Sequence, residues 1–184
     1  MKRNKTLKTV LALSLMATVM TSCSSDDDTP EIINEEEIIT TLTVTLTSAN
    51  GTATLQSQDL DGDGPNAPVI TADNLTANTT YTGSIELLNE TESPAEDITE
   101  EVEEEADEHQ FFFSLNGSLT DVTYSDEDGD GNPIGLEFEL TTGDAGSGSI
   151  TITLRHEPTK PNDGTLADAG GETDIAQTFT VVVE

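Results

Sequence analysis

The chain has 184 residues, of which 37 are acidic and six are basic, so its formal net charge at pH 7 is −31. A protein this negative repels nucleic acid and anionic lipid, which excludes both as expected ligands, and it attracts divalent cations and cationic ligands. The length is that of one domain with a short leader.

Residues 1–22 have the parts of a secretory signal peptide. An apolar run over residues 10–19 has about the length of a signal core, and small residues follow it. The residues that supply positive charge before this run are Lys2, Arg3, Lys5 and Lys8. The run is too short to span a bilayer, which needs about 20 apolar residues, so we expect an anchored chain rather than a spanning one.

The stretch Met20-Thr21-Ser22-Cys23 resembles a bacterial lipobox. The resemblance implies cleavage before Cys23 and lipidation of its sulfur, which leaves no thiol for a disulfide or a zinc–thiolate site. Three aspartates at residues 26–28 resemble the acidic export tag of Bacteroidota-type surface lipoproteins. This implies a protein anchored by lipid in the outer membrane and facing the cell exterior. Residues 23–37 are acidic with few apolar side chains, and we expect them to form a flexible tether.

Residues 38–184 are predicted to form one β-sandwich domain. Leu42, Val44 and Leu46 alternate with threonines, which is typical of a half-buried strand. A turn at residues 49–51 leads to a hairpin partner at residues 52–58. Further strands are expected at residues 69–71, 81–88, 111–115, 119–124, 136–141, 150–155 and 178–183. Short strands separated by Gly, Asn, Asp and Pro turns predict an all-β, Ig-like antiparallel sandwich.

One short acidic helix interrupts this pattern. Ser93 is expected to cap it, with Pro94 in the first helical position and Glu96 closing a capping box. A narrow apolar stripe then recurs every four residues among glutamates, at Ile98, Val102 and Ala106. We expect this helix to pack across one end or edge of the sandwich.

The seven residues Leu75-Thr76-Ala77-Asn78-Thr79-Thr80-Tyr81 resemble the tyrosine corner of fibronectin type III domains. The resemblance implies an Ig-like sandwich in which Tyr81 begins a strand and its hydroxyl group bonds backward to the main chain.

Two aspartate-rich loops match calcium-binding templates. The first has Asp126, Asp128 and Asp130 at alternate positions, Gly131 for a sharp turn and Glu137 in the twelfth position. The second repeats the aspartates and the following glycine, Gly64, but has no acid in the twelfth position; its aspartates are Asp59, Asp61 and Asp63. We expect calcium at these loops, and the alternative is that they are acidic turns without a metal.

The two histidines offer a second kind of metal site. If the fold unites His109 and His156 with Glu108 or Glu157, two imidazoles and a carboxylate would suit zinc or copper. Otherwise His109 caps the helix and His156 pairs with a local acid. The two basic residues after Cys23 are expected to pair with carboxylates such as Glu172 and Asp174; they are Arg155 and Lys160.

Neither histidine belongs to a recognisable catalytic constellation, and a nucleophile elbow is missing from the sequence. We therefore expect a non-enzymatic surface lipoprotein, stabilised by calcium and serving binding or adhesion. The alternative is a lipoprotein that captures a cation or a metallophore beside an outer-membrane TonB-dependent importer. A hydrolase that uses a pair of carboxylates is a weaker third hypothesis.

Overall fold

The computed structural model describes residues 37–61 and 65–184, which belong to a compact unit spanning Glu35–Glu184. The predicted signal peptide, Cys23, nearly all of the predicted tether and Asp63 lie outside the described residues. Within the described part of the chain, the helices are all too short and too polar to cross a membrane.

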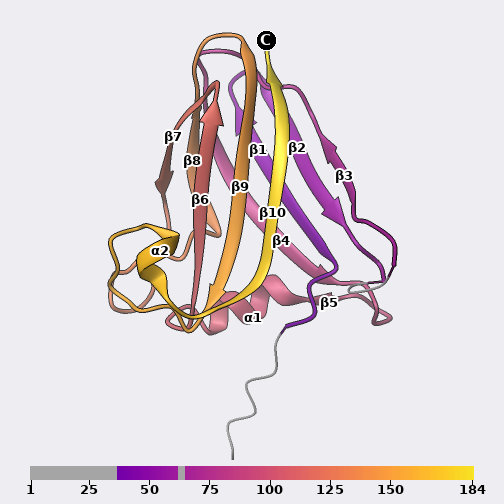
Figure 1. The fold of residues 1–184 in the computed structure, drawn as a ribbon, viewed down its shortest axis with the longest axis vertical. Coiled ribbons are helices and arrows are strands. Elements are labelled where there is room, and N and C mark those ends of the chain that lie inside the picture. Colours follow the sequence, from indigo (N-terminus) through magenta and orange to yellow (C-terminus); the bar gives the residue numbers. More distant parts are fainter. Residues whose placement is uncertain (1–36, 62–64) are drawn as a thin grey trace, which may run out of the picture. The chain divides into compact units, whose positions relative to one another are not determined.

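Two antiparallel sheets face each other across one apolar core (Figure 1). The larger sheet has the order β3-β2-β1-β4-β8-β7, and β5 pairs with β4. Its strands are β1 (Thr41–Ser48), β2 (Gly51–Gln58), β3 (Val69–Ala72), β4 (Thr80–Asn89), β5 (Glu96–Asp97), β7 (Leu119–Tyr124) and β8 (Glu137–Thr142). The smaller sheet has the order β10-β9-β6, with β6 (His109–Gly117), β9 (Gly146–His156) and β10 (Glu172–Val183). The prediction of an all-β antiparallel sandwich is confirmed.

Alternation along the strands produces this core. In β1, the side chains of Leu42, Val44 and Leu46 are fully buried, while the threonines between them are largely half-buried. β1 is central because β2 and β4 pair with it on either side, so that Val44 lies opposite Leu55 and Ile85. Each predicted strand overlaps an observed strand. Three of the observed strands, β6, β9 and β10, begin two or more residues earlier than predicted, and β6 and β10 begin at polar residues that reach the end of the sandwich.

The acidic helix is α1 (Ile98–Glu104), and its predicted start was wrong. Asp97 is the N-cap, and its Oδ1 accepts a hydrogen bond from the Thr99 N–H at 3.0 Å. Glu96 is used differently, because it lies in β5 and pairs with Asn89 of β4. The predicted apolar stripe is buried as expected at Ile98 and Val102, so α1 packs across one end of the two sheets (Figure 1). A second helix of four residues, α2 (Leu166–Ala169), was not predicted.

The backward hydrogen bond of a tyrosine corner is present at the start of β4. The Tyr81 hydroxyl oxygen accepts a hydrogen bond from the backbone N–H of Thr76 at 2.7 Å, and the ring is buried. Leu75 is buried beside it and pairs with Val183, the last residue of β10. The pairing of Leu75 with Val183 therefore connects the segment before β4 to the C-terminal end of β10 in the smaller sheet.

Candidate functional site

Two histidines lie side by side at the end of the smaller sheet that adjoins α1. His109 is the first residue of β6 and His156 is the last residue of β9, and the antiparallel register pairs them directly. Directly opposite residues in such a pair have Cβ atoms about 4.5–5.5 Å apart. The two imidazole rings accordingly approach to a centroid distance of 4.7 Å, with 36° between their planes. The fold thus supplies the proximity that the zinc or copper hypothesis required.

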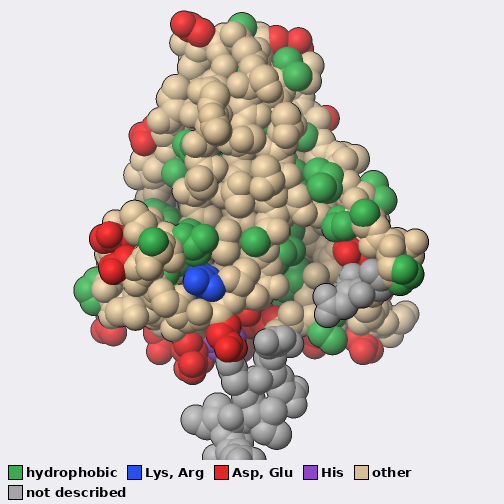
Figure 2. All heavy atoms as spheres, viewed as in Figure 1, with side chains coloured by type: hydrophobic (Ala, Val, Ile, Leu, Met, Phe, Trp, Pro, Cys, Tyr) green, Lys and Arg blue, Asp and Glu red, His purple; other side chains and the backbone are tan. Residues whose placement is uncertain are grey.

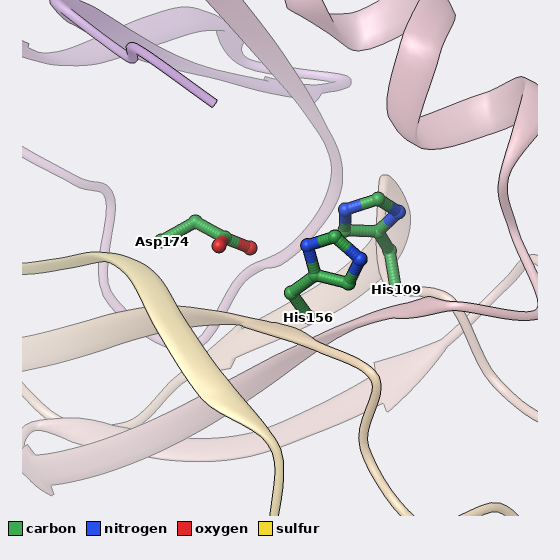
Figure 3. Close-up of side chains that lie close together, drawn as sticks. All are labelled: His109, His156 and Asp174. Atoms are coloured by element: carbon green, nitrogen blue, oxygen red, sulfur yellow. The ribbon is translucent and has the colours of Figure 1, made fainter. Parts of the chain in front are cut away.

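A β-bulge in β10 brings a carboxylate to the same place. The pairing of β10 with β9 shifts between Thr173 and Ile175, so Asp174 is the extra residue. Strict alternation back from the buried positions near the C-terminus would turn residue 173 inward; those buried positions are Phe179, Val181 and Val183. The bulge reverses this alternation and places Asp174 beside the two histidines (Figure 3). Bulges commonly re-aim side chains in this way at functional sites.

His109, His156 and Asp174 form a compact set of possible metal ligands from three neighbouring strands (Figure 3). Each offers one ligand atom, and the three atoms lie within 4.8 Å of one another. The His109 side chain is fully buried, and that of His156 is 8% exposed. Imidazole nitrogen and carboxylate oxygen are ligands that zinc and copper both accept.

A hydrogen bond to the main chain fixes the tautomer of His109. His109 Nδ1 lies 3.2 Å from the carbonyl oxygen of Glu105, at the end of α1. Because a carbonyl oxygen only accepts, Nδ1 is the donor, and in the neutral ring Nε2 keeps its lone pair. Histidine ligands of metals usually make such a second hydrogen bond. His156 Nε2 lies 3.8 Å from Glu108 Oε2, and its buried Nδ1 has no hydrogen-bond partner among the described residues.

The pKa of His109 lies above its ordinary value. Burial acts to lower this pKa, but the contact with the Glu37 carboxylate, the Glu105 carbonyl group and the charge of Asp174 together outweigh it. Glu37 Oε1 is 3.3 Å from His109 Nε2 and forms a charge contact with it. Because a metal binds only the neutral imidazole, a raised pKa means that protons compete with any metal for His109.

Further carboxylates surround the histidine pair. Glu37 and Glu105 have oxygens near His109, and Glu108 and Glu157 have oxygens near His156. Glu157 adopts a left-handed backbone conformation with φ of 47°, and its N–H donates to the Glu108 carbonyl at 2.7 Å. Figure 2 shows acidic side chains gathered at the end of the sandwich where α1 lies, with histidine atoms visible between them. Such a negative rim raises the local concentration of cations.

The sequence predicts calcium at the loop of residues 126–137. In the structure, carboxylates of this loop accept hydrogen bonds from backbone N–H groups of the same loop. Asp126 accepts hydrogen bonds from the backbone N–H groups of Gly135 at 2.7 Å and of Glu137 at 3.0 Å. The loop borders an acidic groove of about 470 Å³ against α1. Among the described residues, the four carboxylates predicted to ligate calcium here do not bring three oxygens within 4.8 Å of one another; these are Asp126, Asp128, Asp130 and Glu137.

A cation from the chain itself contacts Asp128. Lys160 Nζ lies 3.2 Å from Asp128 Oδ2 and also donates to the Ala106 carbonyl oxygen at 2.6 Å. Burial acts to raise the pKa of Asp128, but hydrogen bonds from Asn132, Lys160 and the Asp130 N–H outweigh it and lower the pKa to about 2. The sequence suggested Glu172 or Asp174 as partners for the two basic residues of the domain. Lys160 pairs with Asp128 instead, and Arg155 donates a hydrogen bond to Thr173.

The second predicted calcium loop is described only in part, because Asp63 lies outside the described residues. Asp61 Oδ2 accepts a hydrogen bond from Asn66 Nδ2 at 2.7 Å. The backbone N–H of Asp59 donates to the Thr40 carbonyl oxygen at 2.7 Å. This loop lies next to the exposed strand β3, and calcium there stays a prediction.

No known protein family, no curated protein and no solved structure matches the chain. The function therefore has to be inferred from the chemistry of its own side chains. Within the described residues, that chemistry is concentrated at the histidine pair, where sequence reasoning identified His109 and His156 but did not identify Asp174 or Glu37 as neighbours.

Proposed function

We propose that the protein is a lipid-anchored lipoprotein of the outer cell surface that captures a divalent transition metal at His109, His156 and Asp174. Zinc is the metal expected first, with copper as its competitor, because a site of two imidazoles and carboxylates suits both. The observation that carries the proposal is the convergence of these three side chains from β6, β9 and the bulge in β10.

The surrounding charge favours capture of a cation. Glutamates flank each histidine, and only two basic residues follow Cys23 in the whole chain. A negative field of this kind attracts divalent cations and speeds their encounter with the site. In this proposal the ion arrives from the cell exterior and passes to an outer-membrane TonB-dependent importer, so the lipoprotein binds without catalysing a reaction.

Zinc titration of the full chain tests the proposal. The chain is purified in detergent without a histidine tag, and a coloured chelator competes for the metal. We expect one zinc ion per chain, and we expect His156→Ala or Asp174→Asn to lower the affinity by more than the roughly 10–100-fold that loss of an outer-shell partner causes. The same titration with copper(II) shows which of the two metals the protein binds more tightly.

Asp121→Asn is the matched control for Asp174→Asn, because it removes the same charge from an exposed position on β7. It should leave zinc affinity within a factor of about two, as expected for a surface change outside the site. If wild-type protein and the His156→Ala variant bind zinc equally, the acidic surface alone holds the metal and the proposed site is wrong.

A further inference from the structure

The acidic groove beside α1 is apolar on part of its surface. Its volume is about 470 Å³, which is within the range of small-molecule binding sites. Three side chains of the core line it, and they are 4%, 6% and 7% exposed in the order Ile85, Ile134 and Leu136. A ligand in the groove would therefore contact hydrocarbon as well as carboxylates, and the burial of apolar surface favours binding.

Three exposed glutamates line the same groove. Glu103 belongs to α1, Glu127 lies in the loop at residues 126–137, and Glu137 is the first residue of β8. Within the part of the chain that the structure describes, none of these carboxylates accepts a hydrogen bond or pairs with a basic side chain. Their three negative charges are therefore not balanced by a cation among the described residues.

The chain's own Lys160 shows what kind of cation this groove accepts. Its Nζ lies 3.2 Å from Asp128 Oδ2 and 2.6 Å from the carbonyl oxygen of Ala106, and both of these residues line the groove. A primary ammonium group is a compact charge with three hydrogen-bond donors, so a carboxylate and a carbonyl oxygen can bind it together. Residues of the groove thus already bind one alkylammonium group, that of a lysine side chain.

We propose that the groove between α1 and the loop at residues 126–137 binds an aliphatic primary amine. The ammonium group lies among the three glutamates, and the hydrocarbon chain lies against the three core side chains. Charge complementarity selects a cation, and the apolar lining selects an organic cation over a hydrated metal ion, which gains nothing from contact with hydrocarbon. This site uses none of the residues that form the histidine site, so the inference stands apart from the proposed function.

A series of straight-chain primary amines tests the apolar contact in the full chain. Propylamine, butylamine and pentylamine carry the same charge and differ only in the number of CH₂ groups. Their affinities are measured by calorimetric titration at about 0.15 M salt, where screening weakens attraction to the acidic surface as a whole. A chelator in every titration keeps metal ions out of the histidine site. We expect the affinity to rise about two- to fourfold with each added CH₂ group.

Two double variants test the carboxylates. Glu103→Gln with Glu127→Gln removes one charge of the groove from α1 and one from the loop, and it should weaken pentylamine binding roughly fivefold. The matched control is Glu100→Gln with Asp130→Asn, at exposed positions of the same helix and the same loop that do not line the groove, and it should stay within about twofold of wild type. Equal affinities for the three amines, or equal losses in the two double variants, would show attraction to an acidic surface only and overturn the amine site. Failure of the wild-type chain to bind pentylamine would overturn it too, and zinc titration without the chelator then shows separately whether the proposed function holds.

Discussion

Replacing Asp128 with asparagine should destabilise the domain through Lys160. The Asp128 side chain is 1% exposed and that of Lys160 is 6% exposed, so both charges are withdrawn from water. Asparagine would keep one acceptor oxygen for the amides of the loop but would turn an NH₂ group or an uncharged oxygen toward the ammonium. Lys160 would then keep only the Ala106 carbonyl as a hydrogen-bond partner within this cluster.

The lowered pKa of Asp128 gives the size of the expected change in the free energy of unfolding. A carboxyl group with an ordinary pKa of 3.8 and a folded pKa of about 2 stabilises the folded state by about 2 kcal/mol near neutral pH. Breaking a buried ion pair by removing one partner typically costs about 3–5 kcal/mol. We therefore expect Asp128→Asn to lower the free energy of unfolding by about 2–4 kcal/mol.

The stabilisation that Asp128 provides should decrease as the pH falls. A carboxyl group whose folded pKa is depressed stabilises the fold above its unfolded pKa, and this contribution disappears as the pH falls from about 4 toward 2. Urea unfolding of residues 24–184, followed by circular dichroism at constant ionic strength, should show the wild type losing stability faster than the variant over this range. The two curves should converge near pH 2.

Asp130→Asn is the control, because it removes the same charge from an exposed position in the same loop. It should change the free energy of unfolding by no more than about 0.5 kcal/mol. Equal losses in Asp128→Asn and Asp130→Asn, or a constant difference between Asp128→Asn and wild type from pH 7 to pH 2, would refute the role given to Lys160.

Three further outcomes are expected. Tyr81→Phe removes the hydroxyl group that accepts from Thr76 and should cost about 1 kcal/mol in urea unfolding; an unchanged midpoint would contradict this. Cys23→Ala should abolish labelling with palmitate and release the protein from membranes, and persistent labelling would exclude the lipobox. Calcium should raise the melting temperature more than sodium does at matched ionic strength. Because Lys160 already pairs with Asp128, calcium has to displace it, and an equal effect of sodium would leave the loop as an acidic turn.

The architecture followed from the sequence because burial in strands has a period of two. Leu42, Val44 and Leu46 identify their own buried face without any knowledge of their partners. Helix α1 was predicted from a different period, an apolar stripe that recurs every four residues. Its start was misplaced because Ser93 and Asp97 are both good caps in isolation, and the pairing of Glu96 with Asn89 decides between them.

The site could be predicted only in part because it depends on register. His109 and His156 are 47 positions apart in the sequence, and their contact requires the pairing of β6 with β9. Asp174 requires in addition a bulge that reverses the alternation of β10, for which the polar stretch before Phe179 gives no signal. Glu37 was placed in the tether because its neighbours are acidic, and composition does not reveal that one carboxylate of such a run packs against a histidine.

The crowding of negative charge around the histidines is itself an argument for a cation. Burial and the neighbouring carboxylates, chiefly Glu96 and Glu37, raise the pKa of Glu101 in α1. The same helix has no basic residue in its last turn, where positive charge would be favourable. Repulsion of this kind opposes folding, and a cation bound near these carboxylates would offset it. A divalent ion at the proposed site would reduce this repulsion and would also give the buried His156 Nδ1 a partner, so we expect zinc to raise the stability of the fold when it binds.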